Sequence, residues 1–264
     1  MKRKGRFLAL VVLIISIQST VVLAATYGLK TVNFNNWAPW TVYGATQVNT
    51  DFGNYKVLQG GDRLKIDTAG RLRFFLPKGS VGSSEGGGII KTSIAAKDNY
   101  TFEYDITFDS NFPWSKGGKI PGISGGAGYT GGDPAWPGDG FSVRMMWAAG
   151  GGIKPYVYHK NQPDVYGDVF GGNFATIQSG KKYHVKYYVK LNTGSNKDGV
   201  LKIYIYDVNN SNNLVGSFVK TNICYRTNGC KIDTAHISIF PGGSDSTWNM
   251  TADGYIRIDS VKWE

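Results

Sequence analysis

The chain is short of glutamate, histidine and cysteine. Its 264 residues include three glutamates (Glu85, Glu103 and Glu264), three histidines and two cysteines. Glycoside hydrolases ordinarily need two carboxylates that flank the scissile bond, so the scarcity of glutamate disfavours hydrolysis, although aspartates leave it open. The two cysteines alone do not make a zinc site, because no histidine or further cysteine lies at the spacing of zinc-finger ligands. We therefore expect neither a metal nor a cofactor.

Long apolar runs are confined to the N-terminus. A basic start is followed by an uncharged apolar run over residues 7–17, and Val22-Leu-Ala24 is typical of a cleavage site. The run is shorter than the about 20 residues that a spanning helix needs. We predict a secretory signal over residues 1–24 and an exported, monomeric chain over 25–264, extracellular or periplasmic, with no stable membrane insertion after cleavage. An uncleaved anchor is the alternative.

Convincing helical periodicity is absent from residues 25–264. Instead, polar and apolar residues alternate in short segments between Gly- and Asn-rich turns. The clearest such segments are 101–108, 183–189, 201–206, 235–240 and 255–263. The pattern predicts one all-β domain, a β-jelly-roll sandwich of two antiparallel sheets with a concave cleft. Residues 111–139, rich in Gly and Pro, are expected to form a long loop.

The composition also restricts the partner. The formal net charge is +10, and the chain stays basic without its first 24 residues, which suggests a polyanionic partner. No dense run of Lys and Arg marks a nucleic-acid tail, and the charges are interleaved with Tyr, Trp and Gly. We expect an anionic polysaccharide and no nucleic acid. Cys224 and Cys230 close a short loop, and in an exported protein they are expected to form a disulfide.

Two neighbouring segments, 140–147 and 155–160, carry the clearest candidate site. Ser142 and Arg144 alternate with apolar residues, and Tyr156 and Tyr158 are also two residues apart. Residues two apart in a strand point to the same face. A hairpin centred near Gly151 would pair Arg144 with Tyr158, and would place a cation beside phenols on one exposed face. Such a face suits an anionic sugar.

These segments resemble a known family, polysaccharide lyase family 14. The resemblance rests on Lys-Gly-Gly-Lys-Ile-Pro-Gly at 116–122, on Gly-Asp-Gly-Phe-Ser-Val-Arg-Met-Met-Trp at 138–147 and on Tyr156-Val-Tyr158. It is densest over about residues 100–160 and extends loosely to the last strand. It implies a β-jelly-roll lyase that acts on alginate or glucuronan. By motif position it implies that the cleft is lined by Lys119, Ser142, Arg144, Tyr156 and Tyr158.

The chemistry of uronan cleavage explains why such residues would be needed. A lyase removes the proton at C5, next to a carboxylate, so a cation must stabilise the charge that develops; the fork of Arg144 suits this. Tyr156, Tyr158 or Lys119 would act as base or acid, and nearby cations would lower the pKa of the tyrosines. Ser142 would orient the sugar. The division of roles between lysine and tyrosine stays open.

Histidines give a weaker signal. His236 shares a strand face with Ser238 and would reach the cleft if its strand lies in the middle of a sheet. His159 has the opposite parity to Tyr158, so it should point into or behind the sheet. We name His159 and His236 as candidate substrate-binding residues, although a structural histidine is the commoner case; His184 is expected on a polar surface.

The sequence favours a secreted lyase that cleaves an acidic uronan by metal-independent β-elimination and leaves unsaturated uronate ends. Two other functions remain open: a non-catalytic carbohydrate-binding jelly roll and, less favoured, a glycoside hydrolase. A structural envelope or matrix protein held by the N-terminal segment is weaker still.

Overall fold

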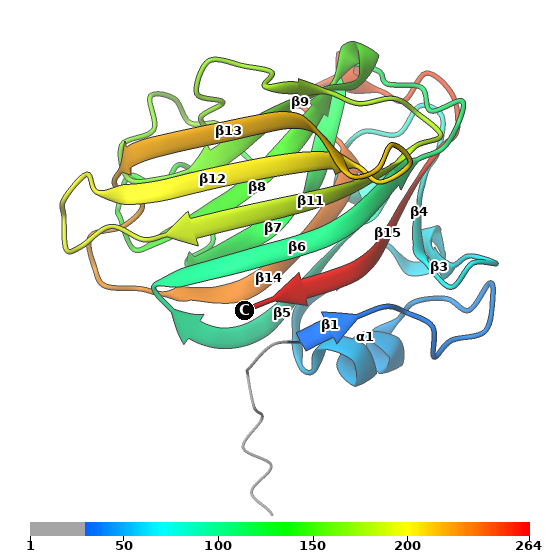
Figure 1. Cartoon of the computed structure of the whole chain (residues 1–264), viewed down its shortest axis with the longest axis horizontal. Helices are drawn as coiled ribbons and strands as arrows, with labels where there is room; N and C mark the ends of the chain where they lie inside the picture. The colour runs from blue at the N-terminus through cyan, green and yellow to red at the C-terminus, as the bar shows by residue number, and fades with distance from the viewer. Residues whose placement is uncertain (1–29) are drawn as a thin grey trace, which may run out of the picture.

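Two antiparallel sheets packed face to face make up the computed structural model, which describes residues 30–264 (Figure 1). The eight-stranded sheet has the order β13-β12-β11-β6-β15-β4-β3, with β1 paired to β15. Its strands are β1 (Lys30–Val32), β3 (Leu64–Ile66), β4 (Leu72–Leu76), β6 (Asn99–Phe108), β11 (Lys182–Lys190), β12 (Gly199–Asp207), β13 (Asn213–Ile223) and β15 (Gly254–Trp263). The predicted sandwich is confirmed.

The seven-stranded sheet has the order β10-β9-β8-β7-β14-β5-β2. Its strands are β2 (Tyr55–Gln59), β5 (Gly88–Lys97), β7 (Gly117–Gly126), β8 (Gly140–Ala148), β9 (Gly152–Tyr158), β10 (Ala175–Thr176) and β14 (Ile232–Pro241). Helices are few among the described residues: α1 (Ala45–Phe52), α2 (Gly82–Glu85) and the single turns η1 (Gly61–Arg63), η2 (Ala149–Gly151) and η3 (Ser246–Trp248). None of the helices between residues 30 and 264 has the length and apolar character needed to cross a bilayer.

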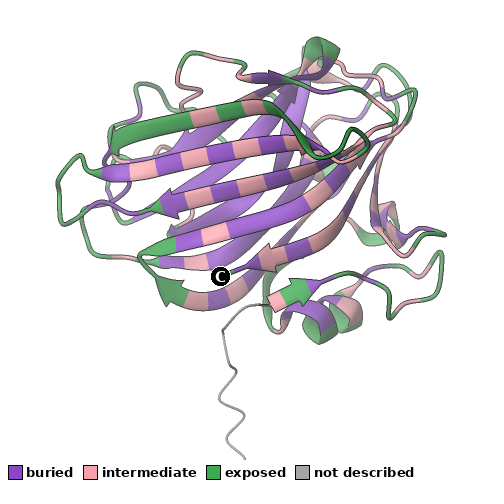
Figure 2. Cartoon of the chain, in the orientation of Figure 1, coloured by how far each residue is buried: buried purple, intermediate pink, exposed green. Residues whose placement is uncertain are grey.

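The two sheets differ in how their outward faces are covered. Strands β11 and β12 alternate strictly between buried and partly exposed residues, so one face meets the core and the other meets solvent (Figure 2). Strands β7 and β8 are buried along nearly their whole length, on both faces. Loops therefore cover the outward face of the seven-stranded sheet, and any cleft there is partly roofed.

Two sequence predictions were wrong about secondary structure. The expected long loop 111–139 contains β7, a ten-residue strand with five glycines and a proline. Hydrogen bonding to β14 and β8 on both sides holds it despite its poor strand propensity. Its glycines allow close packing, since a Cβ at Gly118 would lie 2.1 Å from the ring of Trp147. The prediction also missed α1, whose short buried face of Val48, Asp51 and Phe52 gives little periodic signal.

The predicted hairpin of residues 140–160 is confirmed, but its register is shifted by two residues. Arg144 pairs with Tyr156 rather than Tyr158, and Ser142 pairs with Tyr158. The reason is that β9 begins at Gly152, directly after the turn η2, which moves the centre of the hairpin toward Gly150. An even shift keeps every side chain on its predicted face.

Segments 1–24 and 25–29 lie outside the described residues, so the predicted secretory signal is neither seen nor tested, and the proposed boundary between signal and mature chain stays a prediction.

Candidate active site

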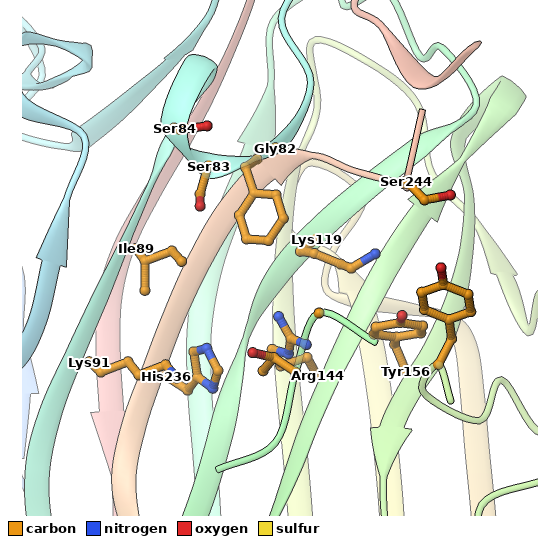
Figure 3. Close-up of a pocket in the computed structure, with 15 residues that line it drawn as sticks. Gly82, Ser83, Ser84, Ile89, Lys91, Lys119, Arg144, Tyr156, His236 and Ser244 are labelled. Atoms are coloured by element: carbon orange, nitrogen blue, oxygen red, sulfur yellow. The ribbon is translucent and has the colours of Figure 1, made fainter. Parts of the chain in front are cut away.

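A cavity of about 390 Å³ lies on the outward face of the seven-stranded sheet (Figure 3). Its floor includes a row of cross-strand neighbours: Lys91 on β5 pairs with His236 on β14, and His236 pairs with Gly122 on β7. On the far side of Gly122 the row continues with Arg144 on β8 and its partner Tyr156 on β9. Cross-strand pairing thus gathers side chains that are up to 145 residues apart in the sequence.

A second row of cross-strand neighbours runs beside the first. Phe240 on β14 pairs with Lys119 on β7, and Lys119 pairs with Met146 on β8, which in turn faces Lys154 on β9. The Nζ atom of Lys119 lies 3.3 Å from Sδ of Met146 and 4.2 Å from the ring centroid of Tyr156. The lysine that the sequence motif singled out therefore lies in the same cavity as the arginine and a tyrosine.

Lys119 reaches the cavity because β7 contains a bulge. Ile120 and Ile123 are three residues apart, yet both are buried in the core, and the pairing with β8 shifts between them. Lys119 and Ser124, five residues apart, consequently both face outward, which regular alternation forbids. The extra residue switches the parity of the strand and turns the amine toward the cleft.

Two tyrosines of the opposite sheet hold this bulge from inside the sandwich. The hydroxyls of Tyr104 on β6 and Tyr187 on β11 both donate to the carbonyl oxygen of Pro121, at 3.2 and 2.8 Å. A Cβ at the next residue, Gly122, would lie 1.9 Å from the carbonyl oxygen of Val143. Glycine is therefore required where the bulged strand crosses beside Arg144.

Two basic residues of the cavity, Arg144 and Lys119, are buried and lack acidic partners. Arg144 is 1% exposed, and its Nε and Nη2 atoms have no hydrogen-bond partner among residues 30–264. Lys119 is 8% exposed, and no Asp or Glu is among the described residues that line the cavity. Burial, helped by the charges of Arg144 and Lys154, holds the pKa of Lys119 well below its usual value; burial also lowers the pKa of Arg144. An uncompensated buried cation is costly, and an anion from outside would relieve that cost.

The two tyrosines take different positions. Tyr156 lines the cavity, whereas Tyr158 is fully buried and its hydroxyl accepts a hydrogen bond from the backbone N–H of Gly132 at 3.1 Å. Their hydroxyl oxygens lie 3.3 Å apart. The expected lowering of the tyrosine pKa is wrong for Tyr156: burial and the neighbouring phenol raise its pKa, against the smaller opposing effect of Arg144. Tyr156 is therefore a neutral phenol that can donate a proton.

Ser142 and His159 are placed away from the cavity. Ser142 is fully buried, and its hydroxyl donates to the carbonyl oxygen of Tyr129 at 2.7 Å. This hydrogen bond connects the loop between β7 and β8 to β8 itself. His159 contacts Asp168 at 3.2 Å and stacks on Phe170, in a separate pocket of about 220 Å³. Neither residue is among those that line the main cavity. Their predicted contact with substrate stays a prediction.

His236 does lie in the cavity, because β14 is in the middle of its sheet as the parity argument required. It is fully buried, and neither ring nitrogen has a partner. Burial and the charges of Arg144 and Lys91 hold its pKa well below the ordinary value. A neutral imidazole offers one donor and one acceptor to a ligand.

Sequence reasoning missed several lining residues. Lys91 extends the main cavity on one side, Tyr166 also lines it, and a smaller adjoining cavity of about 220 Å³ adds Lys154 and Trp248. Lys91 alternates with buried Ile90 and Thr92, so the period-two pattern was readable, but nothing in it distinguishes a cleft lysine from a surface lysine. Lys154 lies within β9 and shares the parity of Tyr156, so it was readable to the same extent as Lys91. Tyr166 lies in a loop and Trp248 in the single turn η3, where the pattern carries no information.

The predicted disulfide is absent from the structure, where Cys224 and Cys230 are both free thiols. The Cys224 sulfur is buried beside the side-chain amide of Asn192, at 3.6 Å, whereas the Cys230 sulfur packs toward Gly126 on β7. Their different neighbours explain why the short loop between them does not bring the sulfurs together. Within residues 30–264, no group of three or more His, Cys, Asp or Glu side chains is arranged to hold a metal ion.

Fold and site together define a class: a jelly-roll enzyme whose cleft offers unpaired cations, an amine and a phenol. Comparison with known families is more specific. Residues 66–260 match the family model Polysaccharide lyase 14, and the chain belongs to that family, as the sequence resemblance implied. It is therefore a polysaccharide lyase, which decides against the non-catalytic binding domain.

Solved structures agree. The chain is similar to the alginate lyase Aly36B, with 36% identity and a TM-score of 0.78 over 89% of this chain and 96% of that one. The marine alginate lyase from Aplysia kurodai is 22% identical, with a TM-score of 0.77 over 89% of this chain and 97% of that one, and shows the same fold. Alginate lyase vAL-1 from Chlorella virus also shows this fold, at 18% identity and with a TM-score of 0.68 over 85% of this chain and 99% of that one. A comparison with curated protein sequences gave no significant match.

Proposed function

We propose that this enzyme is exported and cleaves a uronan of the alginate or glucuronan type by metal-independent β-elimination, leaving unsaturated uronate ends. The observation that carries the proposal is the group of Arg144, Lys119 and Tyr156 in one cavity with no acidic residue on its walls. The similar enzyme Aly36B, with a lysine and a tyrosine replaced by alanine, has been solved with an alginate tetrasaccharide. That complex supports an anionic polysaccharide as the substrate here.

Arg144 would bind the carboxylate of the sugar that loses its C5 proton. Its unpartnered Nε and Nη2 atoms suit a two-pronged contact with a carboxylate. When the C5 proton leaves, negative charge spreads onto that carboxylate, and a cation already fixed in a buried site stabilises it without reorganisation. Binding also supplies the anion that the buried guanidinium lacks.

Lys119 and Tyr156 have the pKa directions that a base and an acid require. The lowered pKa of Lys119 favours a neutral amine, which takes the C5 proton; the raised pKa of Tyr156 keeps its hydroxyl protonated, and it donates that proton to O4. The C4–O4 bond then breaks and a double bond forms between C4 and C5. The ammonium left behind lies over the ring of the phenolate, 4.2 Å from its centroid, and transfer of a proton from Nζ to the phenolate oxygen, through water where the two atoms are not in direct contact, would restore the enzyme.

None of the described residues that line the cavity is acidic, which argues against hydrolysis, because a glycosidase ordinarily needs two carboxylates at the bond. The deciding assay follows the ultraviolet absorbance of the unsaturated uronate during incubation with alginate and with glucuronan, with and without a chelator. We expect absorbance to rise on at least one uronan and to be unaffected by the chelator. New reducing ends without that absorbance would mean hydrolysis, and loss of activity with the chelator would contradict the metal-independent route.

A further inference from the structure

The cavity continues past Arg144 to a second cation that the cleavage chemistry does not use. Lys91 and Arg144 belong to one cross-strand row but lie on strands three apart, so their backbones are separated by about 14 Å at the usual strand spacing. Figure 3 shows Lys91, His236, Arg144 and Tyr156 in that order across the sheet. The row is long enough to contact more than the sugar that reacts.

The middle of the row has unsatisfied polar atoms. Gly122 has no side chain, and the main chain of β8 at Val143 and Arg144 lies directly against it, which brings Arg144 close to the strand that carries His236. His236 is fully buried, lines the cavity, and has no hydrogen-bond partner for either ring nitrogen. A buried donor without a partner costs free energy unless a ligand or water satisfies it.

Electrostatics favour an anion here as well. Lys91 is only partly exposed, no acidic residue lines the cavity around it, and burial together with the charges of Arg144 and Lys56 lowers its pKa. Of these three cations, Lys56 already has an acidic partner in Asp233. Lys91 and Arg144 thus repel each other across a neutral histidine, and only an anion between or beside them would reverse that repulsion.

We propose that Lys91 and His236 form a second carboxylate-binding position, which takes another uronate of the same polysaccharide chain while Arg144 holds the uronate that reacts. Resting on the proposed function, the assignment gives a structural reason why a polymer with several uronates in succession should bind better than one in which charged sugars are isolated. Lys91 supplies the charge, and the imidazole of His236 donates its N–H to the carboxylate or to a hydroxyl beside it.

The test measures binding in a Lys119→Ala background, where turnover is blocked. Two ligands are compared by calorimetry: a tetrasaccharide made only of uronates, and a synthetic tetrasaccharide that carries a single uronate. Lys91→Met removes the charge at similar length, and Lys91→Arg retains it. Lys202→Met is the matched control, because Lys202 lies on the outward face of the eight-stranded sheet beside Tyr188.

Lys91→Met should weaken binding of the all-uronate ligand about tenfold, as expected for loss of one charge-assisted contact, and leave the single-uronate ligand within about twofold. Lys91→Arg should restore most of the loss, and Lys202→Met should change neither ligand. Equal weakening of both ligands, or of neither, would overturn the second position while leaving the lyase proposal intact. If the parent binds neither ligand and forms no unsaturated product, both proposals fail.

Discussion

The outward faces of the two sheets carry the same residue types in opposite electrostatic states. On the eight-stranded sheet, Lys182 and Lys186 pair with Asp105 and Glu103 at 2.8 and 3.1 Å, and His184 contacts both carboxylates. Each of these charged groups has a partner of opposite charge and is at least partly exposed to solvent. That face is an ordinary satisfied surface.

On the outward face of the seven-stranded sheet, a lysine, an arginine and a histidine are buried, and none of the described residues that line their cavity is acidic. Lys119, Arg144 and His236 all have lowered pKa values, chiefly because burial penalises their charged forms. Residue type therefore does not distinguish a site from a surface; the difference lies in burial without partners. Burying these unpaired groups lowers the stability of the folded protein, and a bound anionic substrate would supply the partners that they lack.

The largest expected effect comes from removing the buried amine. Lys119→Met should lower kcat by at least about a hundredfold, the usual contribution of a general base, and should raise the free energy of unfolding by about 1 kcal/mol or more, since it replaces a buried amine that has no acidic partner on the cavity walls with an apolar side chain of similar length. Turnover assays and urea unfolding measure the two quantities. The matched change Lys186→Met on the satisfied face should leave kcat unaltered and cost less than about 1 kcal/mol. A destabilised Lys119→Met protein would contradict the comparison.

A second contrast concerns the tyrosines. Tyr156→Phe keeps the ring that packs against Lys119 but removes the proton that O4 needs, so kcat should fall by about a hundredfold with little change in KM. Tyr204→Phe, on the opposite face beside Lys186, should have no effect on either constant. Full activity of Tyr156→Phe would exclude this phenol as the acid and leave that role to another group.

A smaller effect is expected from inside the sandwich, where Tyr187 supports the β7 bulge. Tyr187→Phe removes the shorter of the two hydrogen bonds to Pro121, and should cost about 1–2 kcal/mol of stability and also lower kcat, because the bulge orients Lys119. Tyr100→Phe is the control: its hydroxyl donates to the carbonyl of Ala95 on β5 at 2.6 Å, and not to the bulge of β7. The control should lose stability but keep its kcat, so an equal loss of kcat in both would refute a positioning role.

The contrast between the faces also explains what the sequence could predict. Alternation predicted β11 and β12 of the eight-stranded sheet, where strict period two survives because one face stays wet. It also predicted β8 and β14 of the other sheet, where polar and apolar residues alternate although both faces are largely buried. It failed on β7, where both faces are buried and glycine replaces the usual strand formers. The central strand of the active site was therefore the one taken for a loop.

The same limit applies to the side chains of the site. Arg144 and Tyr156 followed from parity within one hairpin, where a register error of two residues did no harm. Parity could not place Lys119, because a bulge held by tyrosines of the other sheet reverses it. Only the family motif identified that lysine. The burial that raises the pKa of Tyr156, against expectation, depends on loops that no local pattern describes.

The smallest expected effect is on the pH dependence of stability, to which two histidines, His236 and His184, should contribute with opposite signs. The folded pKa of His236 lies below the unfolded value of 6.5, so below that value the unfolded chain binds more protons, and the stability that His236 contributes falls as the solution is acidified. For His184, hydrogen bonding to Asp105 raises the folded pKa above 6.5. Its contribution is therefore complete below pH 6.5 and is lost as the pH rises through the folded pKa.

Urea unfolding of the parent, His236→Gln and His184→Gln proteins between about pH 5 and pH 8 measures both contributions. On acidification from pH 7, the stability of the parent should fall relative to His236→Gln. On raising the pH above 6.5, the parent should lose its advantage over His184→Gln, by a modest amount because His184 is partly exposed to solvent. Parallel curves for the two variants would mean that the histidines share one environment, and the contrast between a satisfied face and an unsatisfied one would not hold for them.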